Sequence, residues 1–333
     1  MRLPGFIDLQ INGYLGVDFS APGLTEAAIA RAFEAIVASG TAGFLPTVIT
    51  SSQEVYEKNL PMLATVMGKP GIGRHALGIH LEGPFLCPEP GYIGAHYPAL
   101  VRLPDPDLLR QLQMLAQGKI RAITLSAGLP GDAALISAAC EMGIRVFLGH
   151  QRCDVADLDR AARAGAVALT HLGNGLPNEL NRFGNSLWAG LVTDSLAAMI
   201  IADGHHVCDD LLRIILKMKG RKNFLLVSDA SPVAGLPPGQ YFALGNTVVL
   251  EPSGYLYAVG KNCLAGSSAN MLHCANYMAG LGLLPPDEIA EAAFSHPLRL
   301  LGLRPEDVPK SDYEIEFDQE NQQFGCKPLA HST

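Results

Sequence analysis

The sequence has little charge and no concentration of basic residues. Charged residues make up 17% of the 333 positions, the formal net charge is -8, and no long run of lysine or arginine is present. Proteins that bind nucleic acid carry clustered basic residues, so we expect no nucleic-acid partner. The composition also offers an anion no general attraction, and a phosphorylated ligand would need a local cation. Because the chain has so few charged residues for its surface, we expect a second copy of the chain to cover part of that surface in a homo-oligomer.

Paired cysteine motifs and long apolar segments are absent as well. The seven cysteines are scattered, and no two form a C-x-x-C pair, which is typical of reduced thiols in a cytosolic protein. The first residues lack the apolar core of a signal peptide, and no segment approaches the ~20 apolar residues of a membrane span. We therefore expect a soluble cytoplasmic protein with no membrane partner.

What the sequence does contain is a regular alternation of short apolar segments with amphipathic ones. The apolar segments that we expect to be strands are 5–10, 43–48, 76–80, 120–125, 144–148, 167–170, 197–202 and 224–228. The expected helices are 25–39, 53–67, 106–117, 132–142, 155–164 and 209–219. Strands and helices in alternation predict a parallel sheet, and eight such units favour a closed (β/α)8 TIM-type barrel over an open sheet. Loops are expected after the third and sixth strands.

The segment that follows the eighth strand has a different character. Residues 232–261 are rich in Gly and Pro and contain alternating apolar runs, which predicts a β-hairpin insertion. Helices are expected at 268–281 and 286–295. We expect one barrel domain over residues 1–302 and a short C-terminal tail over 303–333, weakly structured or strand-like.

Polar residues gather where the predicted strands end, at the face that carries the active site in barrels of this kind. Six of the ten histidines fall on this face: His80, His96, His150, His171, His205 and His206. Glu82, His150 and His171 together predict a metal site, because two imidazoles and one carboxylate suit Zn²⁺ or Fe²⁺ and leave a position open for water.

A free carboxylate near such a site can move protons, and Asp229 is the first choice for this base, with Asp203 second. Each residue also has an ordinary structural explanation. A single histidine at a strand end is more often a hydrogen-bonded structural residue than a ligand, which is what we expect of His80. Asp229 on its own could be a helix N-cap or a turn residue. Of the pair His205 and His206, we expect only one to face the pocket.

Short motifs in a fixed order carry a resemblance to a known family. They are the segments 4–13, 43–47, 78–85, 94–96, 149–150, 170–177, 201–207, 227–230 and 264–268. With these segments the chain resembles the N-acetylglucosamine-6-phosphate deacetylase family of the amidohydrolase superfamily, over about residues 4 to 300. The resemblance implies hydrolysis of N-acetylglucosamine 6-phosphate to glucosamine 6-phosphate and acetate by a metal-dependent enzyme that forms a homodimer.

The resemblance also implies a role for single residues. Glu82, His150 and His171 match the metal ligands of the family, and Asp229 matches its base. His96 matches a histidine that contacts the acetyl group or the sugar. The residues that match phosphate contacts are Asn174, the backbone of Gly175, His206 and Arg182. In family dimers this arginine can reach the pocket of the neighbouring subunit.

Some positions depart from the wider pattern. Gln10 and Asn12 stand where many amidohydrolases carry His-x-His, so we expect one divalent metal per subunit, with Zn²⁺ first and Fe²⁺ second. Few residues precede the first strand, and the usual closing run is absent from the tail, so we expect the small β-sandwich of the family to be absent or vestigial. Gly173, Gly175 and the segment 151–153 depart near the substrate.

These departures leave two other functions open. One is an amidohydrolase that acts on another N-acyl amine, a cyclic amide or an unphosphorylated sugar. The other is a non-catalytic sensor of a sugar phosphate.

Overall fold

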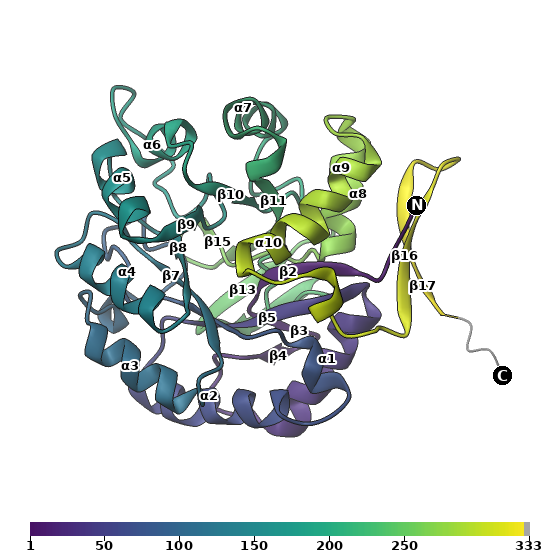
Figure 1. Ribbon diagram of the computed structural model, residues 1–333, viewed down its shortest axis with the longest axis horizontal. Helices are drawn as coiled ribbons and strands as arrows, with labels where there is room; N and C mark the ends of the chain where they lie inside the picture. Colours follow the sequence, from purple (N-terminus) through teal and green to yellow (C-terminus); the bar gives the residue numbers. More distant parts are fainter. Residues whose placement is uncertain (330–333) are drawn as a thin grey trace.

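Eight parallel strands form the centre of the computed structural model, which describes residues 1–329 (Figure 1). They are β2 (Phe6–Ile11), β5 (Thr41–Ile49), β6 (Ile79–Glu82), β7 (Ile120–Leu125), β8 (Arg145–Leu148), β9 (Ala166–Leu169), β10 (Ala197–Ile200) and β11 (Phe224–Leu226). Neighbours in this order pair in parallel, from β2 through to β11. All eight predicted strands and the barrel are thereby confirmed.

The first and last strands of this sheet meet at a seam that closes the barrel. Ile11 and Ala230 form an isolated parallel bridge there. Deeper in the seam, the carboxylate of Asp8 accepts hydrogen bonds from the backbone N–H of Ser228, at 3.1 Å, and from its hydroxyl. Burial raises the pKa of Asp8 to about 6, although these hydrogen bonds act in the opposite direction. Side chains therefore complete the seam where the strand ladder stops.

Helices form the outer layer around the sheet (Figure 1). They are α1 (Glu26–Ala38), α2 (Gln53–Met67), α3 (Pro106–Leu115), α4 (Asp132–Glu141), α5 (Val155–Ala164), α6 (Ser186–Val192), α7 (Asp209–Lys219) and α8 (Met271–Leu281). A side chain at the N-cap accepts a backbone N–H in several of them, for example Thr25 in α1 and Asp154 in α5. Helix α6 was missed from the sequence, because its seven residues are too few to show a helical period.

The inside of the barrel is filled with apolar side chains. Phe147, Leu45 and Leu225 are fully buried there. Phe294 and Leu298 close this core and come from the helical segment η4 (Glu291–Ser295) and from α10 (His296–Leu301). These segments follow α9 (Pro286–Ala290). The expected helix at 286–295 is therefore present and continues to residue 301.

The insertion after β11 consists of β-hairpins, as the sequence predicts. Strands β12 (Gly239–Ala243), β13 (Asn246–Leu250), β14 (Leu256–Ala258) and β15 (Cys263–Leu264) form an antiparallel sheet. It has a small core of its own that includes Val248, Leu256 and Ala265. A short hairpin of β3 (Gly13–Tyr14) and β4 (Val17–Asp18) was not predicted.

The two ends of the described chain meet in a third small sheet. Strand β1 (Arg2–Leu3) pairs with β16 (Tyr313–Asp318), which pairs with β17 (Gln323–Pro328). Phe324 packs edge-on against Phe6, with ring centroids 5.9 Å apart. The tail is thus strand-like. Residues 330–333 of the expected tail lie outside the described residues, and the division at residue 302 stays a prediction.

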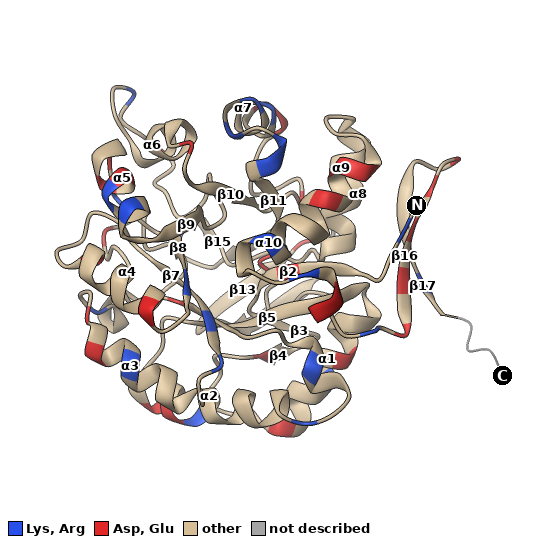
Figure 2. Ribbon diagram, viewed as in Figure 1, with Lys and Arg blue, Asp and Glu red and all other residues tan. Residues whose placement is uncertain are grey.

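Charged residues lie mainly on the outer helices and on this third sheet (Figure 2). None of the helices within residues 1–329 is long and apolar enough to cross a membrane.

Candidate active site

The predicted metal ligands and the predicted base lie at or just beyond the carboxyl ends of the strands. Glu82 ends β6, and His150 and His171 lie two residues beyond the ends of β8 and β9. The φ angles of His150, His171 and Asp229 are 49°, 31° and 50°. Residues with a Cβ atom rarely adopt this left-handed region, and backbone strain of this kind gathers at functional sites. Each turn directs its side chain into the mouth of the barrel.

Three of these side chains converge on one point. The Nε2 atoms of His171 and His150 lie 3.0 Å and 3.3 Å from Oε1 of Glu82. One donor atom from each of the three residues lies within 4.8 Å of the others, and all three side chains are buried. The other ring nitrogen of His150 lies 2.8 Å from the carbonyl oxygen of Tyr92, which leaves Nε2 for a ligand. The donor set and its spacing fit one divalent metal ion.

The carboxylate of Glu82 stays ionised in spite of its burial. Burial by itself raises the pKa of Glu82, but contacts with His150 and His171 outweigh it and hold the pKa well below the ordinary value. Gln10 adds a hydrogen bond from Nε2 to Oε1 of Glu82 at 2.9 Å. Glu82 is therefore available as an anionic ligand at neutral pH.

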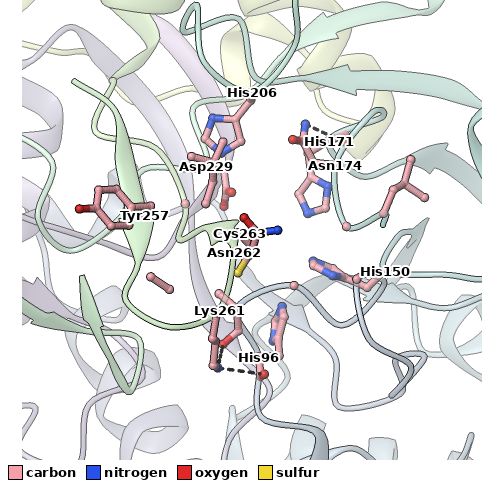
Figure 3. Close-up of a pocket in the computed structure, with 18 of the residues that line it drawn as sticks. His96, His150, His171, Asn174, His206, Asp229, Tyr257, Lys261, Asn262 and Cys263 are labelled. Atoms are coloured by element: carbon pink, nitrogen blue, oxygen red, sulfur yellow. Dashed lines mark hydrogen bonds between the residues drawn. The ribbon is translucent and has the colours of Figure 1, made fainter. Parts of the chain in front are cut away.

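Asp229 lies across the cavity mouth from these histidines (Figure 3). It accepts one hydrogen bond from the amide of Asn12 at 2.7 Å, to Oδ1. Burial, and after it the charge of Glu82, raises the pKa of Asp229 to about 6. A carboxylate with a pKa just below neutrality can both accept and return a proton, as general base catalysis requires.

A cavity of about 1290 Å³ opens above the cluster. His96, Asn174, Gly175 and His206 all line it, together with the metal-site residues and Asp229. The structure thus brings together every predicted site residue except Arg182. That residue lies on an exposed loop, with its guanidinium 4.5 Å from the ring centre of Phe183, and is not part of the cavity wall in the single chain.

The second choice for the base has other contacts. Oδ2 of Asp203 lies 2.7 Å from Nδ1 of His206 and accepts the hydroxyl of Ser267 at 2.6 Å. Its other oxygen accepts the backbone N–H groups of His205 and His206. Asp203 therefore holds His206, and Asp229, which has no such contact with a histidine within residues 1–329, is the carboxylate beside the Glu82, His150 and His171 cluster. Both His205 and His206 line the cavity, so the expectation that only one would face it was wrong.

His80 lies below the site and has a structural environment, as expected. Its Nε2 lies 2.8 Å from the hydroxyl of Thr124, and the ring packs against Phe147 with centroids 5.7 Å apart.

Sequence reasoning missed the residues that the hairpin insertion supplies. Tyr255, Tyr257, Lys261 and Asn262 all line the cavity. Tyr257 lies on the side opposite His150 and Asn174 (Figure 3). The sequence could have indicated these residues through the position of the insertion in the chain order. An insertion after the last strand starts at the carboxyl end of the barrel, so it is placed to form a wall of the mouth.

A parallel eight-stranded barrel with a buried Glu/His/His cluster and an adjacent aspartate defines a metal-dependent amidohydrolase. No protein-family model matches the chain. It is 36% identical over 310 residues to N-acetylglucosamine-6-phosphate deacetylase of Bos taurus, covering 90% of this chain and 74% of that protein. It is 30% identical over 303 residues to N-acetylgalactosamine-6-phosphate deacetylase of Escherichia coli O157:H7, covering 90% of this chain and 78% of that protein.

Solved structures agree with these sequence relatives. An N-acetylglucosamine-6-phosphate deacetylase mutant from Mycobacterium smegmatis, in complex with N-acetyl-D-glucosamine-6-phosphate, superposes with a TM-score of 0.86 at 26% identity. The match covers 97% of this chain and 84% of that chain. The Pasteurella multocida enzyme gives 0.84 at 28% identity, over 98% and 85%. The chain belongs to the N-acetylglucosamine-6-phosphate deacetylase family.

Proposed function

We propose that the chain hydrolyses the N-acetyl amide of N-acetylglucosamine 6-phosphate to acetate and glucosamine 6-phosphate. The observation that carries the proposal is the cluster of Glu82, His150 and His171, which shares one cavity with the unligated carboxylate of Asp229. A binding protein would need the ligands but not a base beside them, which argues against a non-catalytic sensor. Relatives named for this reaction support the substrate, and one of them is known in complex with it.

We propose that Glu82, His150 and His171 hold one divalent ion, Zn²⁺ as first choice and Fe²⁺ as second. Such an ion, when bound, polarises a carbonyl group and lowers the pKa of a bound water. A single ion is favoured because Gln10 and Asn12 direct their amide N–H groups at Glu82 and Asp229. A carboxamide in this arrangement serves the carboxylates as a hydrogen-bond donor.

Two residues of the chain act on the amide in this proposal. Asp229 takes a proton from the attacking water and then gives it to the nitrogen as the amine leaves. The hydrogen bond from Asn12 fixes the orientation of Asp229 for both transfers. The imidazole of His96, buried beside His150 with ring centroids 4.6 Å apart, contacts the acetyl carbonyl. Water and substrate thus meet between His96 on one side and Asp229 on the other.

We propose that the phosphate group lies against Asn174, the backbone of Gly175 and His206, with Arg182 of a second copy completing the subsite. Arginine suits this role because its planar guanidinium donates two parallel hydrogen bonds to phosphate. Phe183 is 84% exposed beside Arg182, and Trp188 of α6 is 48% exposed. Large exposed apolar side chains are typical of a surface that a partner chain covers. Because these lie near Arg182 in the sequence, the homodimer and the role of the arginine are parts of one proposal.

A second substrate should be assayed because a relative at 30% identity is named for the galacto epimer. The two sugars differ at one hydroxyl group, so both phosphates should be compared. The unphosphorylated sugar tests the first of the other functions left open by the sequence.

The test is release of acetate and free amine from N-acetylglucosamine 6-phosphate by protein loaded with Zn²⁺ or Fe²⁺. We expect equal amounts of both products, loss of activity after chelation, and its return when metal is added. N-acetylgalactosamine 6-phosphate and plain N-acetylglucosamine are the matched arms. Metal-loaded, folded protein that releases acetate from none of these would contradict the proposal.

We further propose a cytoplasmic location, because all seven cysteines lie among the described residues and none is in a disulfide. For the domains, we propose that residues 1–302 form the catalytic unit. The C-terminal tail from residue 303, which contributes β16 and β17, would then be the remnant of a small β domain.

A further inference from the structure

The imidazole of His96 has no hydrogen bond of its own within the described chain. Its Nδ1 atom is buried without a partner, and its Nε2 atom lies 3.7 Å from Oε2 of Glu82, beyond hydrogen-bond distance. The ring is buried and packs edge-on against His150. Because no side-chain hydrogen bond within residues 1–329 holds the ring, its position over the metal ligands depends on this packing and on the main chain that carries it.

That main chain is attached to the hairpin insertion. The carbonyl oxygen of Ala95 accepts two hydrogen bonds, from Nδ2 of Asn246 at 3.1 Å and from Nζ of Lys261 at 2.9 Å. The same ammonium group donates to the carbonyl oxygen of His96 at 3.4 Å. The side chain of Ala95 also packs against the small core of the insertion. Figure 3 shows Lys261 beside His96 at the edge of the cavity.

The next residue strengthens this attachment. Nζ of Lys261 lies 4.4 Å from the ring centre of Tyr97, within range of a cation–π contact, and the Tyr97 hydroxyl donates to the carbonyl of Gly245. Gly245 has a φ of +72°, and a Cβ atom there would lie 2.6 Å from Cε2 of Tyr97. Three consecutive residues, 95 to 97, are thus held by the insertion, and Lys261 contacts all three.

We propose that Lys261 is a positioning residue, which fixes the main chain of residues 95–97 and so places the imidazole of His96 over the metal ligands. The hairpin insertion then supplies part of the alignment for a reaction that the barrel strands carry out. The part of this proposal that concerns the reaction rests on the proposed function. Within residues 1–329, Lys261 is also the one lysine or arginine that lines the cavity, so direct contact with the substrate phosphate is the alternative that the test must separate.

The test is a double-mutant cycle between Lys261 and His96. We expect Lys261→Ala to lower kcat about 10- to 100-fold with KM changed less than about threefold, because a displaced catalytic group costs up to ~10²-fold in rate. Lys261→Arg should recover most of the loss, since a guanidinium can donate to both carbonyls. In a His96→Ala background, Lys261→Ala should lower kcat by less than about twofold, because its effect passes through the missing imidazole.

A matched control is Lys58→Ala. Nζ of Lys58 also donates to a backbone carbonyl, that of Pro22 at 2.7 Å, but on an exposed part of the chain outside the cavity. It should retain the wild-type kcat and KM. Asn246→Ala, which removes the second hydrogen bond to Ala95, should give a smaller loss of kcat in the same direction and serves if Lys261→Ala does not fold.

Amide hydrogen exchange separates this proposal from the proposed function. Lys261→Ala should speed exchange in peptides that contain residues 93–97 and leave the barrel strands unchanged, whether or not the substrate is correct. Unchanged exchange there would overturn the proposed attachment. A rise in KM with unchanged kcat would assign Lys261 to substrate binding, and equal losses with and without His96 would show an independent role; either result sinks the proposal. Absence of turnover in the wild type counts against the proposed function alone.

Discussion

The interior and the mouth of the barrel are built from the same strands but have opposite chemistry. Below the mouth, Phe147 and Leu225 pack in a mainly apolar core that Phe294 and Leu298 close. A few residues further along the strands, buried positions are occupied by carboxylates, imidazoles and carboxamides. Buried polar groups are costly unless they are paired; Glu82 and Asp229 accept hydrogen bonds here, whereas Nδ1 of His96 has no partner within residues 1–329. The interior thus provides the stability, and the mouth, which costs stability, provides the chemistry.

Asp229→Asn should have the largest effect, because it removes the chemistry of the mouth and leaves the interior unchanged. The substitution keeps the size of the side chain and removes the base, so we expect kcat to fall by ~10³-fold or more. Relief of a buried charge beside Glu82 should leave the thermal midpoint equal to or above that of the wild type. Stopped acetate assays measure kcat, a thermal melt measures the midpoint, and metal analysis checks that the variant and the wild type carry equal metal. An active Asp229→Asn protein would remove Asp229 from the mechanism.

Phe147→Ala tests whether the barrel interior provides stability and not activity. Removal of a fully buried ring in the barrel interior should lower the free energy of unfolding by about 3–5 kcal/mol, through lost burial and the cavity left behind. The kcat of the remaining folded protein should stay within a few-fold of wild type. Urea unfolding and active-site-normalised assays provide the comparison. A large loss of kcat in fully folded protein would show that interior and mouth are coupled.

The pH profile tests the electrostatics of the mouth. The carboxyl group of Asp229 acts as a base only when it is ionised, and its pKa is raised to about 6 by burial and by Glu82. Activity should therefore be full above that pH and fall about tenfold per unit below it. The positive charge of a bound metal acts in the opposite direction, so the acid limb should lie at or below pH 6. A limb that stays in place in other variants but is altered in Asp229→Glu would assign it to this residue.

Arg182→Ala carries the smallest expected effect. If the arginine of a second copy binds the phosphate, KM for the phosphorylated sugar should rise ~10-fold, as for the loss of a hydrogen bond to a charged group. The kcat value and the KM for the plain sugar should change little. Mixing Arg182→Ala with Asp229→Asn protein offers a control, because in mixed dimers a shared site would combine an intact Asp229 with an intact Arg182 and restore the low KM for the phosphorylated sugar. Unchanged KM for the phosphorylated sugar would reject the role of Arg182.

The sequence predicted the mouth well because its geometry is imposed by the fold. Once eight strands are placed in parallel, residues at their carboxyl ends must meet, so Glu82, His150, His171 and Asp229 can be grouped by their positions along the chain alone. The attachment of residues 95–97 to the insertion could not be predicted in this way. The hydrogen bond from Lys261 to Ala95 joins residues 166 positions apart on two loops, and no periodicity reports such a contact. Helix α6 was too short for its pattern to stand out.

The pairing of β1 with β16 has a consequence for synthesis of the protein. Arg2 and Leu3 have their partners at Glu316 and Ile315, more than three hundred positions away, and the barrel seam likewise joins β2 to residues beyond β11. Contacts of such long range form late, because the intervening chain must first be ordered. Until β16 has been synthesised, the backbone N–H and C=O groups of β1 have no strand to pair with. We therefore expect a pause in translation before residue 313 to leave a partly folded chain that is prone to aggregation.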